Sequence, residues 1–156
     1  MLGYWNGAGV DTSCFGNGWF RTGDLGHLDD DGYLHVSDRK KDMILSGGLN
    51  IYSREVEDVL RRHDAVADVA VVGVPDPTWG EAVVAVVVRR PAASVSADAL
   101  IGHCRASLAS YKKPRRVEFV DELPRNTAGK VLKYKIRERL GADVNDQLAP
   151  RSGDDT

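Results

Sequence analysis

The chain has 156 residues, about the length of one domain, and its 42% hydrophobic and 28% charged residues are typical of a soluble globular protein. A formal net charge of −2 argues against a dedicated nucleic-acid binder, and no apolar run approaches the ~20 residues that span a bilayer. Cys14 and Cys104 lack zinc-ligand and disulfide-framework spacing, and the N-terminus lacks a secretory signal, so we expect a cytoplasmic protein without a metal site.

The N-terminal region predicts loops and β-hairpins. Residues 1–17 are rich in Gly, Asn and Asp and show no hydrophobic period, which predicts irregular structure. Two short strand-like runs then flank Asp31-Gly32, a hairpin-turn signal. A second pair of apolar runs flanks Gly47-Gly48, where glycine permits a positive φ and the close approach of a ligand to the backbone.

The next region predicts an amphipathic helix. Val56, Val59, Leu60 and His63 fall at positions i, i+3, i+4 and i+7, the spacing of one helix face. Ser53 precedes them, and a serine side chain can cap a helix N-terminus. We therefore expect a helix that begins at Ser53 and buries one face.

The remaining elements predict a sheet covered by helices. Residues 66–74 and 82–88 are strongly β-branched and are separated by a proline-containing turn, so we expect two central strands. Ser96 starts a second helix, and residues 116–120 predict a short strand. The expected apolar stripes of the second and last helices are Leu100, Ile101, Cys104 and Leu108, and then Leu132, Ile136 and Leu140.

The order of these elements predicts an α+β fold. A central three-stranded sheet would be packed by about three helices and preceded by β-hairpins. From Gly141 onward the chain is polar, carries four aspartates and shows no apolar period, so this tail is expected to be mobile.

Gly129-Lys130 has the look of a phosphate-binding element, but two common nucleotide motifs are absent. A P-loop needs Gly-x4-Gly-Lys-Ser/Thr, whereas Pro124 holds the first glycine position and Val131 follows the lysine. The stretch "GNGWFR" fails the dinucleotide fingerprint, because Arg21 stands where the third small residue belongs. The four histidines show no metal-ligand spacing, which favours structural or solvated roles for them.

Three segments taken together carry a family resemblance: "GWFRTGDLG", "DRKKDMILSGGLNIYSREVE" and "LPRNTAGKVLK". In this order and at this spacing they closely resemble the C-terminal third of the adenylate-forming acyl-CoA synthetases, which include fatty-acyl-CoA ligases, coumarate-CoA ligases and luciferases. Two further stretches, "GVPDPTWGE" and "YKKPRRVEFVDELP", fit the same family. The resemblance extends from about Gly3 to Leu140 and favours the fatty-acyl-CoA ligase branch.

The resemblance implies a two-step reaction. A carboxylate attacks the α-phosphate of Mg-ATP and gives an acyl-adenylate and pyrophosphate. The thiol of coenzyme A then attacks the acyl carbon and releases AMP. In such enzymes the small C-terminal domain swings between two poses, one for each step, so ATP, AMP, Mg²⁺ and coenzyme A are the implied cofactors and substrates.

The resemblance also implies a nucleotide site that includes Asp24, Arg39 and Asn50. Asp24 would bind both ribose hydroxyls, since a carboxylate can accept two hydrogen bonds from a diol. The alternative is a turn-forming aspartate beside Gly23. Arg39 would reach the ribose or a phosphate from the domain junction, unless it is one solvated charge in a run of four. Asn50 would face a phosphate.

The resemblance implies that Lys41 and Gly48 act in the alternation between the two poses. Lys41 occupies the hinge position of the family, where backbone torsions change. Gly48 would line the pantetheine channel in the thioester-forming pose, where a Cβ would narrow the passage. A turn glycine at position 48 is compatible with that role.

Lys130 resembles the adenylation lysine, carried on a mobile loop. Its ammonium would bridge the incoming carboxylate and the α-phosphate, and would stabilise the charge that develops on both in the transition state. Arginine would substitute poorly, because a compact charge must fit between two anions. An isolated Gly-Lys would instead be a solvated lysine. The following cations are expected on the solvated helix face, with contacts to coenzyme A phosphates as a secondary role: Lys133, Lys135, Arg137 and Arg139.

The family's larger N-terminal domain is not recognisable in the sequence. Residues 1–37 would be the remnant of its end, residues 38–140 the mobile C-terminal domain and residues 141–156 a disordered tail. ATP, Mg²⁺ and the acid would be held mainly by the missing domain, supplied in cis or in trans. A positioned cation loses its effect when its substrates are not positioned, so the isolated chain is expected to be inactive.

Other classes remain open. The chain could be a non-catalytic remnant or a docking module for a separate adenylation core. It could also belong to a carrier-protein-loading adenylation enzyme, although no Gly-Gly-x-Ser carrier site follows. A nucleic-acid interpretation rests only on the basic patch near residues 112–139, which lacks interleaved aromatics. The acyl pocket is absent, so fatty acid is expected from the similarity of the motifs alone.

Overall fold

A computed structural model describes residues 1 and 3–148, and the side chains of residues 1 and 3–141. The chain forms two compact units, the first comprising Met1–Lys41 and the second beginning at Asp42. No helix in the described part of the chain is both long and apolar enough to cross a membrane.

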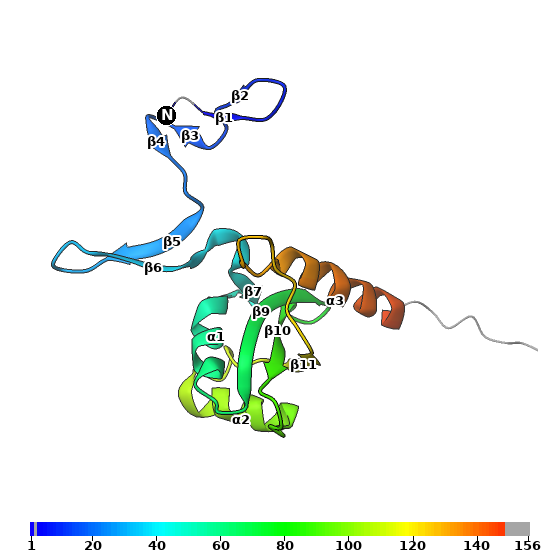
Figure 1. The fold of residues 1–156 in the computed structure, drawn as a ribbon. Coiled ribbons are helices and arrows are strands. Elements are labelled where there is room, and N and C mark those ends of the chain that lie inside the picture. Colours follow the sequence, from blue (N-terminus) through cyan, green and yellow to red (C-terminus); the bar gives the residue numbers. More distant parts are fainter. Residues whose placement is uncertain (2, 149–156) are drawn as a thin grey trace, which may run out of the picture. The chain divides into compact units, whose positions relative to one another are not determined.

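The first unit consists of three antiparallel β-hairpins (Figure 1). The expected turn is confirmed, because Gly32 has φ 84° and the Asp29 carboxylate accepts hydrogen bonds from the N–H groups of Asp31 and Tyr33. The irregular structure expected for residues 1–17 is only partly correct, since short strands form where tight turns close the chain. The strands are β1 Tyr4–Trp5, β2 Val10–Asp11, β3 Phe15–Gly16, β4 Trp19–Phe20, β5 Asp24–Leu28 and β6 Leu34–Arg39.

The second unit is built on a five-stranded sheet, which confirms the expected α+β class. Its centre is β10 (Gly80–Arg89), which pairs antiparallel with β9 (Val66–Asp76) and parallel with β11 (Arg116–Val120). The hairpin of β7 (Ile44–Ser46) and β8 (Leu49–Ile51) joins β10 through the pairing of Ser46 with Gly80. The helices of the second unit are α1 Ser53–Arg61, α2 Ala97–Ser107 and α3 Lys133–Leu148 (Figure 1). The 3-10 turn η1, Lys40–Asp42, contains the last two residues of the first unit and the first residue of the second.

The valine-rich strands bury both of their faces, as their composition predicts. Successive side chains of a strand point to opposite faces, so the odd and even positions of β9 and β10 enter different cores. The even positions pack against α3 through Ile136 and Leu140. The odd positions belong to the layer that α1 and α2 cover, together with Leu100 and Cys104 of α2. These odd positions are Val69, Val71, Val83, Ala85 and Val87. The central strands are therefore sandwiched between two helical layers.

The helix ends test the predicted caps. Ser96 caps α2, because its side chain accepts a hydrogen bond of 3.2 Å from the Ala99 N–H. The predicted Ser53 cap is wrong: Tyr52 holds the N-cap position of α1 without a side-chain bond, and Ser53 is fully buried. His63 lies beyond the end of α1.

The last helix continues past the expected boundary at Gly141. A helix-interior glycine costs only about 1 kcal/mol relative to alanine, so Gly141 does not end α3, which runs to Leu148. The remainder of the predicted tail, residues 149–156, lies outside the described residues.

Candidate functional site

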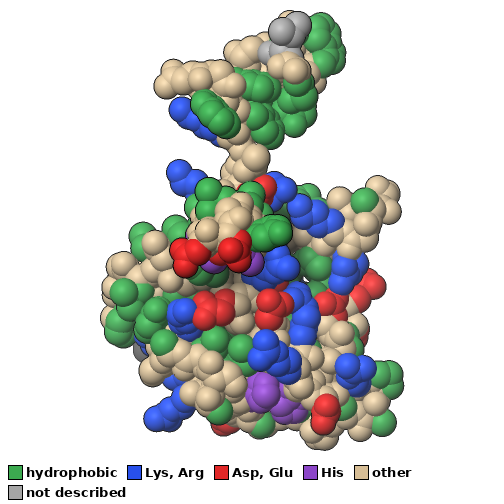
Figure 2. Space-filling model, turned by 90° about the vertical axis from the view of Figure 1, so that its left-hand side faces the viewer, with side chains coloured by type: hydrophobic (Ala, Val, Ile, Leu, Met, Phe, Trp, Pro, Cys, Tyr) green, Lys and Arg blue, Asp and Glu red, His purple; other side chains and the backbone are tan. Residues whose placement is uncertain are grey.

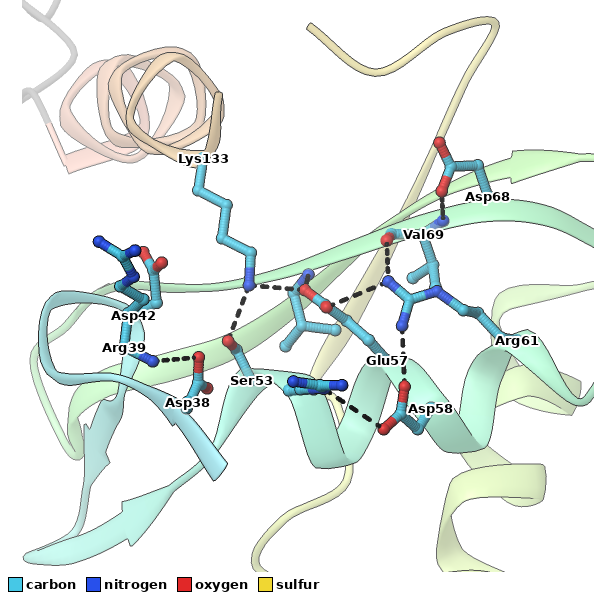
Figure 3. A network of polar contacts seen from close by, with 12 residues as sticks. Asp38, Arg39, Asp42, Ser53, Glu57, Asp58, Arg61, Asp68, Val69 and Lys133 are labelled. Carbon is cyan, nitrogen blue, oxygen red and sulfur yellow. Dashed lines mark hydrogen bonds and ion pairs between the residues drawn. The ribbon is translucent and has the colours of Figure 1, made fainter. Parts of the chain in front are cut away.

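The first unit brings Asp24 and Arg39 together. The two residues are register partners in β5 and β6, and the Arg39 Nε lies 2.7 Å from the Asp24 carboxylate. The Arg39 N–H also donates to the Asp38 carboxylate at 2.7 Å (Figure 3). An open pocket beside the pair is lined by Thr22, Gly23, Arg39, Lys40 and Lys41. An exposed carboxylate and guanidinium at one pocket edge can bind a diol and an anion.

The predicted hinge residue, Lys41, lies in the 3-10 turn η1. It is the last residue of the first compact unit, and Asp42 is the first residue of the second.

The β7–β8 hairpin carries Gly48 and Asn50. Gly47 and Gly48 form its tip with φ values of 58° and 78°, a left-handed backbone that favours glycine. A Cβ at Gly48 would meet no atom within 4 Å of this chain, so within the chain the backbone conformation alone explains this glycine. Asn50 lies exposed on β8, opposite Leu45.

Sequence reasoning missed an aromatic and cationic surface beside this tip. The Gly47 N–H donates to the Trp79 carbonyl at 2.8 Å, and a Cβ at Gly47 would lie 2.9 Å from the Trp79 ring. The Arg115 guanidinium carbon lies 4.2 Å from the centroid of that ring, and the Trp79 side chain remains 42% exposed. The signal was present in the segment "GVPDPTWGE", where a tryptophan stands next to a turn glycine.

Lys130 stands at the end of the loop between β11 and α3. Gly129 precedes it with φ 78°, and the Lys130 side chain is exposed. Among the residues that the structure describes, none forms an ion pair or side-chain hydrogen bond with the Lys130 ammonium. The second unit thus presents the Lys130 amine to solvent without a carboxylate partner from the described chain, and Lys135 is exposed in the same way.

Lys133 has a different environment, and its predicted place on the solvated face of the helix is wrong. Its ammonium lies 2.7 Å from a Glu57 carboxylate oxygen and 2.7 Å from the Ser53 hydroxyl (Figure 3). The side chains of Lys133 and Glu57 are only 16% and 8% exposed. The same carboxylate accepts the Val71 N–H at 2.9 Å and pairs with Arg61 at 3.2 Å. The long-range pairing removes Lys133 from solvent.

Arg137 also departs from the predicted solvated face. Its guanidinium lies 2.7 Å from the Asp42 carboxylate, and the two side chains are 30% and 16% exposed. Lys135 and Arg139, the other two cations of this helix, are exposed as predicted.

The buried thiol is not a nucleophile. Cys104 is fully buried, and burial raises the pKa of its thiol to about 11, which keeps it protonated at neutral pH. Its neighbour His103 instead contacts the Val59 carbonyl at 3.0 Å. Within the described residues, no group of three His, Cys, Asp or Glu side chains could hold a metal ion.

Comparisons with known proteins identify a family and relatives of similar sequence. Residues 55–130 match the family described as AMP-binding enzyme C-terminal domain. The chain is 47% identical over 141 residues to the long-chain-fatty-acid–CoA ligase FadD13 of Mycobacterium tuberculosis and 48% identical over 141 residues to a feruloyl-CoA synthase of Amycolatopsis sp. These alignments cover 90% of this chain but only 28% and 29% of the relatives.

Solved structures give the same result. The ATP-bound MatB of Rhodopseudomonas palustris matches with a TM-score of 0.82 and 41% identity, over 89% of this chain and 28% of that one. An o-succinylbenzoate CoA synthetase of Bacillus subtilis, in complex with its acyl-adenylate, matches with a TM-score of 0.80 and 44% identity, over 88% of this chain and 28% of that one.

The chain carries the AMP-binding enzyme C-terminal domain. Its relatives include acyl-CoA and aryl-CoA ligases of the adenylate-forming superfamily, and the chain spans a little over a quarter of their length. The expected family and fold class are thus confirmed.

Proposed function

We propose that this chain is the C-terminal portion of an ATP-dependent acyl-CoA synthetase and that Lys130 is its adenylation lysine. The observation that carries the proposal is the exposed Lys130 ammonium, which has no ion-pair partner in the described chain. A lysine whose charge is not neutralised by its own domain is available to anions held elsewhere. The same domain pairs the ammonium groups of Lys112 and Lys133 with glutamates.

The adenylation step needs positive charge where two anions meet. A carboxylate oxygen forms a bond to the α-phosphorus while the bond to pyrophosphate breaks, and pyrophosphate leaves with the electron pair. Lys130 would contact the attacking carboxylate and an α-phosphate oxygen and reduce their repulsion, an electrostatic contribution that is often the largest in an active site. Mg²⁺ would be held by the ATP phosphates and the partner domain, since the described residues offer no metal cluster.

The first unit would contribute to nucleotide binding. The Asp24 carboxylate would accept both ribose hydroxyls, and the Arg39 guanidinium that now contacts it at 2.7 Å would orient it or reach a phosphate. Lys41 would be the hinge, and the division of the chain directly after this residue supports that assignment.

The thioester step would use the surface around the β7–β8 tip. Gly48 would line the pantetheine channel and Asn50 would face a phosphate. The Trp79 ring and the Arg115 guanidinium next to Gly47 offer an aromatic face and a positive charge, which suit the adenine and phosphates of coenzyme A.

A second domain is a required partner in this proposal. The first unit exposes a set of large apolar side chains, visible in green on its surface in Figure 2, and an exposed apolar surface of this kind marks an interaction site. A large adenylation domain of about the length that the relatives possess beyond this chain would cover it. The exposed residues are Tyr4, Trp5, Val10, Trp19, Phe20, Leu28, Tyr33, Leu34 and Val36.

We further propose a fatty acid as the acyl substrate and the cytoplasm, where ATP and coenzyme A are available, as the location. Two long-chain-fatty-acid–CoA ligases, from Mycobacterium tuberculosis and Salmonella typhimurium, are 47% and 44% identical to the chain and support this choice. The feruloyl-CoA synthase is 48% identical, so aryl acids are the competing substrate class.

The proposal is tested by joining this chain to the preceding part of FadD13, in place of the segment that matches it. The fusion is expected to form acyl-CoA from ATP, coenzyme A and a long-chain acid, whereas the chain alone shows no thioester formation. Thioester formation by the purified chain alone would overturn the need for a partner. A folded fusion without activity, compared with FadD13 itself as the positive control, would overturn the proposed function. Replacing the fatty acid with ferulic acid in the same assay tests the acyl class.

A further inference from the structure

The loop that carries Lys130 is closed by its own hydrogen bonds. The Asn126 side-chain oxygen accepts the N–H groups of Ala128 at 3.1 Å and Lys130 at 2.8 Å. The backbone N–H of Asn126 donates in return to the Lys130 carbonyl at 3.0 Å. At the neck of the loop, the Leu132 N–H donates to the Pro124 carbonyl at 2.7 Å. The backbone of Lys130 is therefore fixed on both its N–H and its C=O side.

Arg125 attaches this closed loop to the sheet. One guanidinium nitrogen donates to the Gly129 carbonyl, in the residue before Lys130, and another contacts the Asp68 carboxylate. Asp68 lies near the start of β9, and its other oxygen accepts the Val69 N–H at 2.9 Å (Figure 3). The planar fork of arginine suits this arrangement, because it can bind two acceptors in fixed directions.

The contribution of this contact to folding is small, which points to another role. The Arg125 and Asp68 side chains are 44% and 29% exposed, and exposed ion pairs contribute little to stability, because water screens their charges. None of the three side chains, Arg125, Asp68 or Asn126, needs to touch a reacting atom. Their shared effect is the position of the Lys130 backbone relative to β9.

We infer that Arg125, Asp68 and Asn126 are positioning residues that hold Lys130 in place for the adenylation step. The inference rests on the proposed function. A cation stabilises a transition state only when it is already in place, and a displacement of about 1 Å can lower a rate about 100-fold. The thioester step does not use Lys130 in this scheme, so it is independent of the clamp formed by these three residues.

The first test uses the chain of 156 residues and needs no activity. In Arg125→Ala and Asp68→Ala, the Lys130 amide is expected to exchange with deuterated solvent about tenfold faster than in the unmutated chain, as measured by NMR. The Val71 amide, which donates to Glu57 in the interior, serves as the internal control and keeps its exchange rate. An unchanged Lys130 exchange rate in both variants would overturn the clamp.

The second test measures the two half-reactions in the FadD13 fusion. Arg125→Ala, Asp68→Ala and Asn126→Ala are expected to lower adenylate formation about tenfold, and thioester formation from a supplied acyl-adenylate stays within about twofold. Asn126→Ser keeps an acceptor oxygen and recovers part of the loss. Arg54→Ala, which removes an exposed arginine from α1, is the matched control with both rates unchanged.

The outcomes distinguish failure of the positioning role from failure of the proposed function. Equal losses in both half-reactions, or an unchanged rate of adenylate formation, would overturn the positioning role. A fusion that makes no adenylate even without substitution would contradict the proposed function. In that case the exchange rates of the Lys130 amide still decide whether Arg125 and Asp68 hold the loop.

Discussion

Two lysines three positions apart in the sequence have opposite environments. Lys130 is exposed on a loop, and its ammonium has no partner within the described chain. Lys133 begins α3 and is 16% exposed, with its ammonium 2.7 Å from both Glu57 and Ser53. One charge is therefore available for an external anion, whereas the other is neutralised inside the domain.

Lys130 and Lys133 carry the same charge, so their different roles follow from their neighbours and not from the residue type. The Lys133–Glu57 pair connects α3 to α1, and Glu57 also binds the backbone of β9 through Val71. A paired buried lysine with these contacts is a structural element. The Lys130 ammonium makes no such contact with the core, which is compatible with the catalytic role proposed for it.

The largest expected effect concerns Lys133. Lys133→Ala leaves the buried Glu57 carboxylate with Arg61 as its remaining cationic partner, so the free energy of unfolding is expected to fall by about 2–3 kcal/mol. Urea denaturation followed by circular dichroism measures this change. Lys135→Ala, an exposed lysine of the same helix, is the control and should change the value by less than about 0.5 kcal/mol.

A double substitution distinguishes the effect of losing the Lys133–Glu57 ion pair from the effect of shortening the Lys133 side chain. Lys133→Met combined with Glu57→Gln removes both charges and keeps similar volumes, so its loss should be smaller than that of Lys133→Ala. A double variant as unstable as Lys133→Ala would show that the change of side-chain shape, rather than the loss of a cation beside the Glu57 carboxylate, causes the loss of stability.

Chemical labelling measures the difference in accessibility between Lys130 and Lys133 in the unmutated chain. An amine-acylating reagent is expected to modify Lys130 at least about tenfold faster than Lys133, since the buried amine reacts only when the structure opens locally. Mass spectrometry of the digested chain gives both rates. In urea the two lysines should react alike, and a native chain in which Lys133 reacts as fast as Lys130 would contradict the structure.

A third lysine gives a smaller effect that depends on pH. The hydrogen bonds from Lys112 to Glu55, at 2.7 and 2.8 Å, raise the pKa of the Lys112 ammonium above its usual 10.5. The stabilising effect is complete below this usual value and disappears as pH rises through the raised pKa. Glu55→Gln should therefore lower the free energy of unfolding by about 0.5–1 kcal/mol at about pH 8, because the pair is partly exposed.

The pH dependence of the stability difference serves as the control for the Lys112–Glu55 pair. The difference between Glu55→Gln and the unmutated chain should shrink above pH 10.5, since Lys112 then loses its charge in both proteins. A difference that grows with pH in this range would contradict the assigned ion pair.

The central sheet could be predicted from the sequence, because burial on two faces needs only a local pattern. The valines of β9 and β10 occupy odd and even positions alike, which is typical of a strand covered on both sides. The pattern does not show which helix covers which face. That assignment depends on connections between elements far apart in the chain.

A candidate site residue could be found from the sequence when a local motif contains it. A residue whose environment depends on a contact distant in sequence could not be placed. Lys130 could be singled out from "PRNTAGK". Lys133 could not be placed, since the Ser53 hydroxyl that it contacts lies 80 positions earlier. The same distance explains why the predicted Ser53 cap is wrong. A serine before an apolar run can cap the helix or accept a hydrogen bond from a distant side chain, and the sequence does not show that Lys133 is the donor. The roles of all the predicted site residues stay predictions: Asp24, Arg39, Lys41, Gly48, Asn50 and Lys130.

The most direct test of the account compares Lys130→Ala with the unmutated FadD13 fusion in each half-reaction. Adenylate formation is expected to fall on the order of 10²–10³-fold, while thioester formation from supplied acyl-adenylate and the free energy of unfolding remain unchanged. This result would assign the exposed ammonium to the first chemical step. Full adenylate formation by Lys130→Ala, or equal losses in both half-reactions, would contradict the account.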